Sequence, residues 1–119
     1  MGADSRANAN GVRFHFAAWK ATAGRMALGS YLGNGLDDRS VSIGWQAAVV
    51  MVKGEGETGR YHPASLGYLT DLSLGMSAIG VGTSEIQTLQ PTGFTLGTDA
   101  RVNATGTSYY WMAFGNGPL

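Results

Sequence analysis

The feature that most constrains this chain is a second copy of its N-terminus near its C-terminus. Residues 2–19 align without a gap with residues 97–114. Seven residues recur unchanged 95 positions later: Gly2, Asp4, Arg6, Asn8, Ala9, Gly11 and Ala18. Most other pairs are conservative, such as Phe14 with Tyr109. A period of this length is too long for a solenoid and matches the size of a small sandwich domain.

The repeat and the chain length together predict the domain organisation. A chain of 119 residues supports one domain. We predict an N-terminal strand and linker over residues 1–26, as a copy of the last strand of the repeat, and a β-sandwich module over residues 27–119. Alternation from Val12 to Lys20 predicts the first strand, with Phe14 and Phe16 on one face.

Alternation and turn residues predict about eight short strands in all. After the first, they cover residues 28–32, 40–43, 47–53, 60–66, 85–89, 93–97 and 107–114. The apolar run 47–53 predicts a central strand. Pro63 cannot donate to a β-ladder, so 60–66 is predicted to be an edge strand. The pattern also allows a short helix within 17–28, and it leaves 67–83 ambiguous.

Composition favours an all-β fold and limits the classes of partner. Glycine accounts for 19 residues and charged residues for only 13%, which is typical of many strands joined by tight turns and unfavourable for a helical bundle. We therefore predict an antiparallel β-sandwich or jelly roll. Eight basic residues balance eight acidic ones, so no charge pattern points to nucleic acid or to an anionic membrane.

Other absences in the sequence narrow the chemistry further. The chain has no cysteine, which excludes disulfides, thiolate zinc sites and thiol nucleophiles. No apolar run approaches the roughly 20 residues of a membrane-spanning helix. We do not expect the polar N-terminus to act as a signal peptide.

Two stretches of the sequence resemble a known type of module. Tyr31-Leu32-Gly33-Asn34-Gly35-Leu36-Asp37-Asp38-Arg39-Ser40 resembles its opening, and Gly93-Phe94-Thr95-Leu96-Gly97-Thr98-Asp99 with residues 102–111 (VNATGTSYYW) resembles its close. Such modules recur in tandem in large bacterial surface proteins and are similar to modules of phage tail and other virion proteins. The resemblance covers roughly residues 28–114, and Ala47 departs from it where proline is usual. It implies a lectin-like sandwich with an appendage or surface role, located outside the cell or on a virion, and it implies no catalytic residues.

Candidate sites for small ligands are few. The stretch 54–59 (GEGETG) matches G-x-G-x-x-G, but no helix start follows it and two glutamates would repel phosphate, so we interpret it as a turn. Asp37 and Asp38 are candidates for Ca²⁺ ligands, although the spacing of an EF-hand is absent. We predict no catalytic residues and no cofactor.

The duplicated strand suggests self-association as the function. One sandwich has one place for such a strand, and an exposed aromatic strand is costly unless a neighbouring subunit pairs with it. The predicted assembly interface consists of the aromatic residues of both copies: Phe14, Phe16, Trp19, Tyr109, Trp111 and Phe114. The expected partners are further copies of the same chain or tandem copies of the module, in a filament, an appendage or a virion.

The alternative function is a carbohydrate-binding module. Exposed aromatic rings stack on sugars in lectin-like domains, and Tyr61 and Tyr68 are the candidates for such contacts. The partner would then be a cell-surface glycan.

Overall fold

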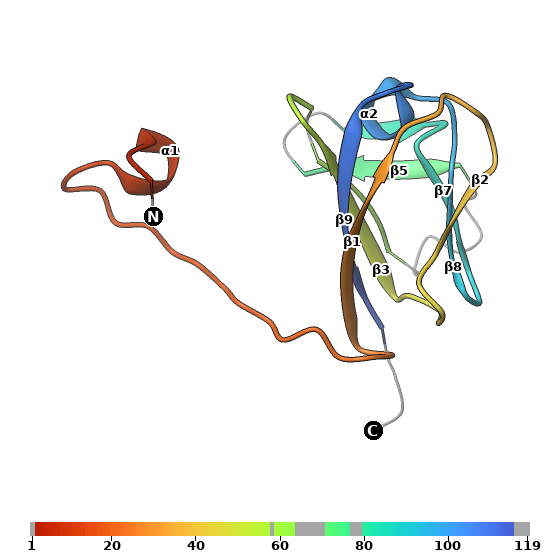
Figure 1. The fold of residues 1–119 in the computed structure, drawn as a ribbon, viewed down its shortest axis with the longest axis horizontal. Helices are drawn as coiled ribbons and strands as arrows, with labels where there is room; N and C mark the ends of the chain where they lie inside the picture. Colours follow the sequence, from red (N-terminus) through yellow and green to blue (C-terminus); the bar gives the residue numbers. More distant parts are fainter. Residues whose placement is uncertain (1, 58, 64–70, 77–79, 116–119) are drawn as a thin grey trace.

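The computed structural model describes residues 2–57, 59–63, 71–76 and 80–115. They form nine strands in two antiparallel sheets, and the predicted all-β, sandwich-like fold is confirmed (Figure 1). Among these residues, no helix is long and apolar enough to cross a membrane.

The larger sheet has six strands in the order β1-β9-β3-β4-β5-β6. Their bounds are β1 Met26–Leu32, β9 Ser108–Phe114, β3 Val49–Gly54, β4 Arg60–Pro63, β5 Leu72–Gly75 and β6 Val81–Thr83. The smaller sheet has the order β2-β8-β7, with β2 Arg39–Ser42, β8 Gly93–Leu96 and β7 Ile86–Gln90. Two four-residue helices complete the described elements: α1 Ser5–Asn8 and α2 Ala100–Asn103.

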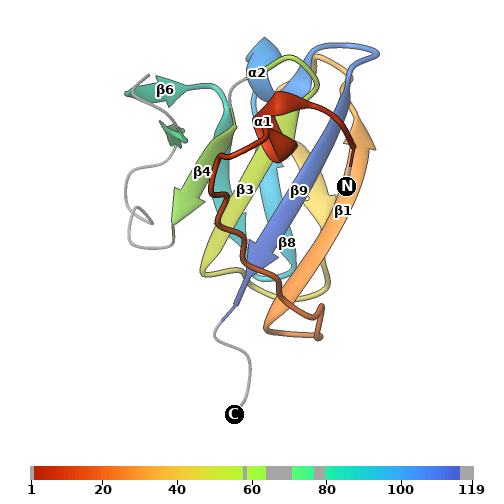
Figure 2. The same cartoon turned by 90° about the vertical axis from the view of Figure 1, so that its left-hand side faces the viewer.

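Strand β9 lies inside the larger sheet, between β1 and β3 (Figure 2). Its Tyr110 pairs with Ser30 on one side and with Lys53 on the other. Because side chains alternate along a strand, Tyr109 and Ala113 face the second sheet, and both are fully buried. The last strand of the chain is thus a central element of the sandwich.

The core lies between the two sheets. It is formed by apolar side chains of both inner faces: Ala47, Val50, Val52, Ile86, Phe94, Leu96, Val102, Tyr109 and Ala113. Phe94 from β8 meets Trp111 from β9 edge to face, with 6.0 Å between ring centroids. Gly29 makes room for that indole, because a Cβ at Gly29 would lie 2.6 Å from the Trp111 ring.

A buried ion pair crosses the sandwich beside the core. Arg60 Nη2 lies 2.6 Å from Glu85 Oε1, and the two side chains are 1% and 0% exposed. Burial raises the pKa of the Glu85 carboxyl, and the positive charge of Arg60 opposes that rise. Each charge offsets the cost of burying the other, so the loss of either partner leaves an unpaired buried charge that destabilises the fold.

The strand predictions hold for most of the sequence, with three corrections. Residues 12–20 were expected to form a strand, but they are extended chain outside both sheets. The predicted edge strand 60–66 is β4, which lies between β3 and β5; Pro63 is its last residue and has no partner in β5, so the missing N–H is tolerated. No helix forms within 17–28, because a turn at Thr22–Arg25 leads into β1.

The ambiguous stretch 67–83 is partly described. It contains β5 and β6, joined antiparallel with Leu72 opposite Thr83. The remainder, residues 67–70 and 77–79, lies outside the described residues, as do residues 64–66 of the predicted strand 60–66.

The buried ion pair gives a testable prediction. Substitution Glu85→Gln leaves the buried Arg60 charge without its counter-ion, so we expect the free energy of unfolding to fall by about 3 kcal/mol. Urea unfolding followed by circular dichroism measures this loss. The matched control Glu55→Gln, at an exposed position, should change stability by less than about 0.5 kcal/mol. Equal effects of the two substitutions would contradict the prediction.

Candidate functional site

The two copies of the repeat form the same helix cap. The Asp4 carboxylate accepts a hydrogen bond from Arg6 N at 2.8 Å, and the Asp99 carboxylate accepts one from Arg101 N at 2.8 Å. Both aspartates have extended backbone, and each is followed by a four-residue helix. Each arginine side chain turns back onto its aspartate, at 3.3 Å in the first copy and 3.1 Å in the second. An aspartate at this position stabilises the first turn of a helix.

The same asparagine bond recurs in both copies. Asn8 Nδ2 donates to Gly2 O at 2.9 Å, and Asn103 Nδ2 donates to Gly97 O at 2.9 Å. This bond closes the loop that carries each helix. Residues 2–8 therefore have both the sequence pattern and the conformation of residues 97–103.

The turn that leads into the strand is also duplicated. Gly11 and Gly106 have φ values of 73° and 79°, a region that favours glycine. Val12 N donates to Ala9 O at 3.3 Å, and Thr107 N donates to Ala104 O at 3.1 Å. The duplication of structure thus runs from residue 2 to residue 12.

What differs is the environment of the two asparagines. Asn103 is fully buried and reaches the turn after β1: it donates to Leu36 O at 2.8 Å and accepts from Asn34 N at 3.0 Å. The Arg39 guanidinium also donates to Asn103 Oδ1, at 3.2 Å. Asn8 is exposed, and these three contacts have no counterpart at Asn8 among the described residues.

The second difference concerns an anchoring hydroxyl. Tyr109 Oη donates to Ala100 O and accepts from Ala104 N at 2.8 Å, which ties β9 to α2. The Tyr109 ring stacks on Tyr31, with 5.3 Å between centroids, and burial raises the pKa of the Tyr31 phenol. The equivalent of Tyr109 in the first copy is Phe14, which has no hydroxyl and so cannot make this tie.

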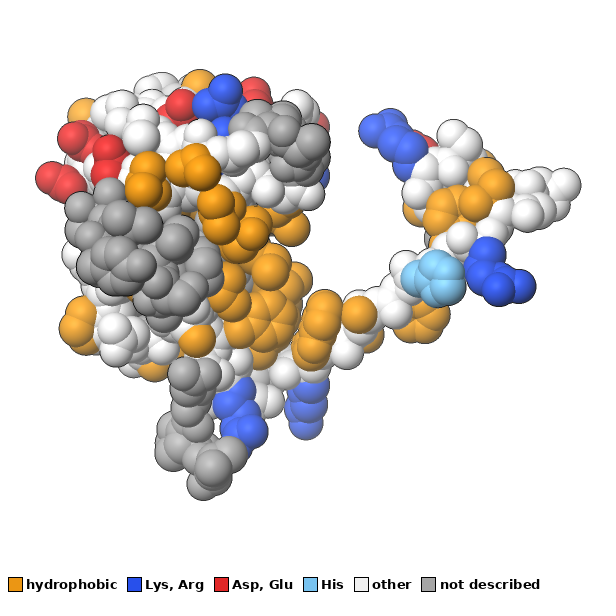
Figure 3. Space-filling model, turned by 180° about the vertical axis from the view of Figure 1, so that it is seen from behind, with side chains coloured by type: hydrophobic (Ala, Val, Ile, Leu, Met, Phe, Trp, Pro, Cys, Tyr) orange, Lys and Arg blue, Asp and Glu red, His pale blue; other side chains and the backbone are white. Residues whose placement is uncertain are grey.

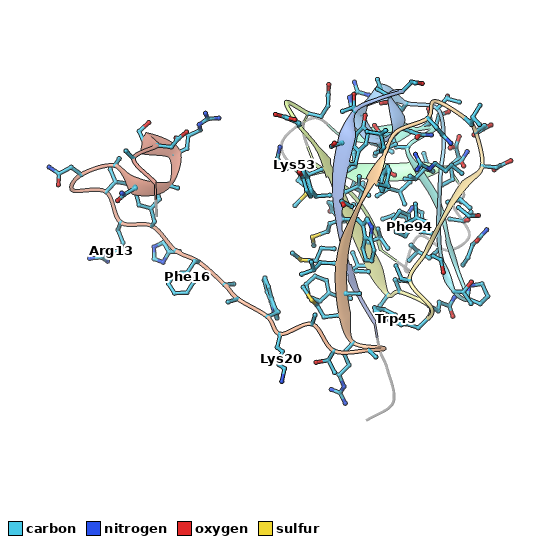
Figure 4. All side chains as sticks on the ribbon, viewed as in Figure 1. Arg13, Phe16, Lys20, Trp45, Lys53 and Phe94 are labelled. Atoms are coloured by element: carbon cyan, nitrogen blue, oxygen red, sulfur yellow. The ribbon has the colours of Figure 1, made fainter. Side chains whose placement is uncertain are left out.

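Residues 13–19, which we call the ribbon, are the equivalent of β9 and lie outside both sheets. Figure 1 shows them as an extended arm leading away from the sandwich. Phe14, Phe16 and Trp19 are 41%, 94% and 59% exposed. Figure 4 shows the contrast between Phe16 on the arm and Phe94 between the sheets. Exposed aromatic side chains on an unpaired extended segment are unfavourable in water and favour association.

The arm meets the body at one aromatic contact. Trp19 packs edge to face on Phe114, with 5.5 Å between ring centroids. These are equivalent residues, the last of the ribbon and the last of β9. Behind them, Gly115 N donates to Arg25 O at 2.9 Å, which bonds the residue after β9 to the residue before β1.

The face of the sandwich turned toward the arm is apolar. Hydrophobic side chains gather there in Figure 3, and they border an open groove. The groove is lined by residues of β3 and β9 and by Met76: Met51, Val52, Lys53, Met76, Tyr110, Trp111 and Met112. This face adjoins the Trp19–Phe114 contact through Met112 and Phe114, which point the same way along β9.

The predicted interface residues therefore fall into two groups. Phe14, Phe16 and Trp19 are exposed on the arm, whereas Tyr109 is buried and Trp111 faces the core of its own sandwich. Phe114 lies at the junction between the groups. Of the six, the three residues on the arm are the exposed ones, whereas Trp111 and Phe114 are half-buried.

The remaining candidate residues are scattered. Asp37 accepts from Asp38 N at 3.0 Å and from Gln87 Nε2 at 2.9 Å, as in an ordinary turn. No group of three or more His, Asp or Glu side chains that could hold a metal ion occurs in the described part of the chain. Tyr61 lies on β4 opposite Met51 and is half-buried, and Tyr68 lies outside the described residues.

Comparison with known proteins adds no further assignment. No family model matches the chain, and neither does any curated protein or solved structure.

Sequence reasoning did not identify Asn103 as a structural centre. The signal was present, because Asn8 and Asn103 are among the seven unchanged residues of the repeat. A buried asparagine with four polar partners cannot be told from a turn asparagine by residue type alone.

The duplicated cap yields a paired prediction. Asp99→Ala removes the cap of a helix packed on the sandwich, so the free energy of unfolding should fall by about 1–2 kcal/mol. Asp4→Ala removes the same bond from a helix outside the body and should change stability by less than about 0.5 kcal/mol. Urea unfolding of both variants at low protein concentration measures the difference. A comparable loss in Asp4→Ala would mean that the N-terminal copy belongs to the folded body.

Proposed function

We propose that this protein is a non-enzymatic structural module that associates with further copies of the same fold through its N-terminal segment. The observation that carries the proposal is the duplication of α2 and its turn by residues 2–12, followed by a ribbon with exposed aromatic side chains. The ribbon corresponds to β9, an interior strand of the larger sheet, but it lies outside both sheets.

Association through the ribbon would remove its aromatic side chains from water. Covering Phe14, Phe16 and Trp19 contributes roughly 1.5–3 kcal/mol for each fully buried ring. The unpaired backbone of residues 13–19 adds hydrogen bonds once it joins a sheet. Because donor segment and acceptor body lie at different places on the molecule, repeated pairing is head to tail and generates a filament or a closed ring.

The resemblance to tandem modules of surface and virion proteins is consistent with this reading. In such an array, residues 2–19 correspond to the last helix and strand of one module, and residues 26–114 to the next. We propose that the module acts on a cell surface, in an appendage or in a virion, and that it catalyses no reaction.

Deletion of the N-terminal segment tests the proposal. The chain without residues 2–20 should sediment as a monomer at all concentrations, whereas the complete chain should gain mass as its concentration rises from about 1 μM to about 1 mM. Analytical ultracentrifugation measures both. A control with Phe14, Phe16 and Trp19 replaced by serine should behave like the deletion.

Equal mass of the complete and the deleted chain over this range would refute association through the ribbon. In that case a glycan array on the complete chain would test the carbohydrate-binding alternative, with Tyr61→Ala as the variant expected to lose binding.

A further inference from the structure

We infer that residues 2–19 are exchangeable with residues 97–114: the N-terminal segment of one molecule fills, in a second molecule, the position of α2 and β9. This inference rests on the proposed function and deepens it, because it names the acceptor site. The acceptor consists of β1, β3, the turn at residues 33–38 and Arg39 at the start of β2.

Main-chain bonds form much of the acceptor site, and main-chain bonds do not depend on side-chain identity. Gly33 N donates to Thr107 O at 2.8 Å, and Gly35 N donates to Asn103 O at 2.8 Å. The equivalent carbonyl groups of the first copy are those of Val12 and Asn8. Since residues 2–12 already have the conformation of residues 97–107, these carbonyls are arranged for the same donors.

The polar side chain that the site requires is also present. Asn103 is held by Leu36 O and Asn34 N of the acceptor turn and by Arg39 of β2. Asn8 makes the same internal bond to its own loop and is exposed. In the acceptor it would take up the buried contacts that Asn103 makes in the closed molecule.

The inward side chains of the ribbon fit the space available. In the alternation of β9, Tyr109, Trp111 and Ala113 face the core. Their equivalents are Phe14, Phe16 and Ala18, none of which is larger, so insertion overpacks nothing. The larger Trp19 replaces Phe114 on the outer face, where the sandwich is open to solvent.

The closed molecule keeps its own segment partly because the fully buried Val102 of α2 has only Ala7 as its equivalent. That segment is also covalently attached, and only Tyr109 has the hydroxyl that bonds Ala100 O and Ala104 N. Tyr109→Phe removes this advantage and makes the internal segment equivalent to the N-terminal one at this position. The smaller side chains Ala7 and Phe16, which correspond to Val102 and Trp111, still leave the internal segment the better fit, so exchange is expected to involve a fraction of the molecules.

Disulfide trapping in the complete chain tests the inference. Tyr110 is the neighbour of Ser30 in the sheet, and its equivalent in the ribbon is His15. Because the chain has no cysteine of its own, every bridge in the variant His15→Cys with Ser30→Cys involves the two introduced thiols, and peptide mapping identifies the bridges that join position 15 to position 30 of another chain. A ribbon in the acceptor site brings these two Cβ atoms to about 4.5–5.5 Å, so a local shift of about 1 Å brings them to the separation of a disulfide.

We expect mild oxidation of this variant in the Tyr109→Phe background to give covalent dimers and a ladder of larger species on non-reducing gels. Their yield should be at least about fivefold above that in the Tyr109 background. The matched control Lys20→Cys with Ser30→Cys should give none above collision level, because Lys20 would lie five residues further along the strand, about 16 Å away. Adding Asn8→Ala should reduce the ladder.

Ladders of equal yield from the test pair and the Lys20 control, or no ladder from either, would overturn the inference. If the chain still gains mass through residues 2–20 but no disulfide forms between positions 15 and 30, the proposed function stands and the ribbon binds elsewhere, with the apolar groove at Met51 and Met112 as the next site to test. If the mass is independent of residues 2–20, the proposed function itself fails.

Discussion

The insertion of β9 between β1 and β3 is the interaction on which the rest of the structure depends. It joins the edge strand β1 to the remainder of the larger sheet and brings Tyr109, Trp111 and Ala113 into the core. Asn103, at the end of α2, fastens the same segment to the turn after β1 through buried hydrogen bonds. The last strand in the sequence thus closes a sandwich whose first strand would otherwise have no partner among the described residues.

The N-terminal copy separates local from tertiary causes of structure. The aspartate cap, the asparagine bond and the positive-φ glycine form in residues 2–12 without a body around them, so short-range sequence suffices for them. The strand conformation of residues 13–19 does not follow in the same way, because a strand requires a partner to satisfy its backbone. The repeated sequence therefore forms its helix and turn in both copies, but it forms a paired strand only in the second copy.

The same distinction explains what could be predicted from the sequence. Alternation and glycine-rich turns located seven of the nine strands in the described part of the chain within a few residues, and the repeat identified the N-terminal segment as a sequence copy of the last of them. The sequence could not show whether that copy is paired in a sheet, because Val12–Lys20 has the alternation of a strand whether or not a neighbour is present. The interior position of β4 was missed because Pro63 suggested an edge, and the Arg60–Glu85 pair and the role of Asn103 depend on contacts between distant residues.

Amide hydrogen exchange, resolved by residue and measured across protein concentration, tests the central claim most directly. In dilute solution the amides of β9 should be strongly protected, while those of residues 13–19 exchange at nearly the rate of an unstructured peptide. At high concentration, residues 13–19 should gain protection as the chain associates. Strong protection of residues 13–19 in a solution that contains only monomers would place the ribbon in the sheet of its own molecule and contradict the account.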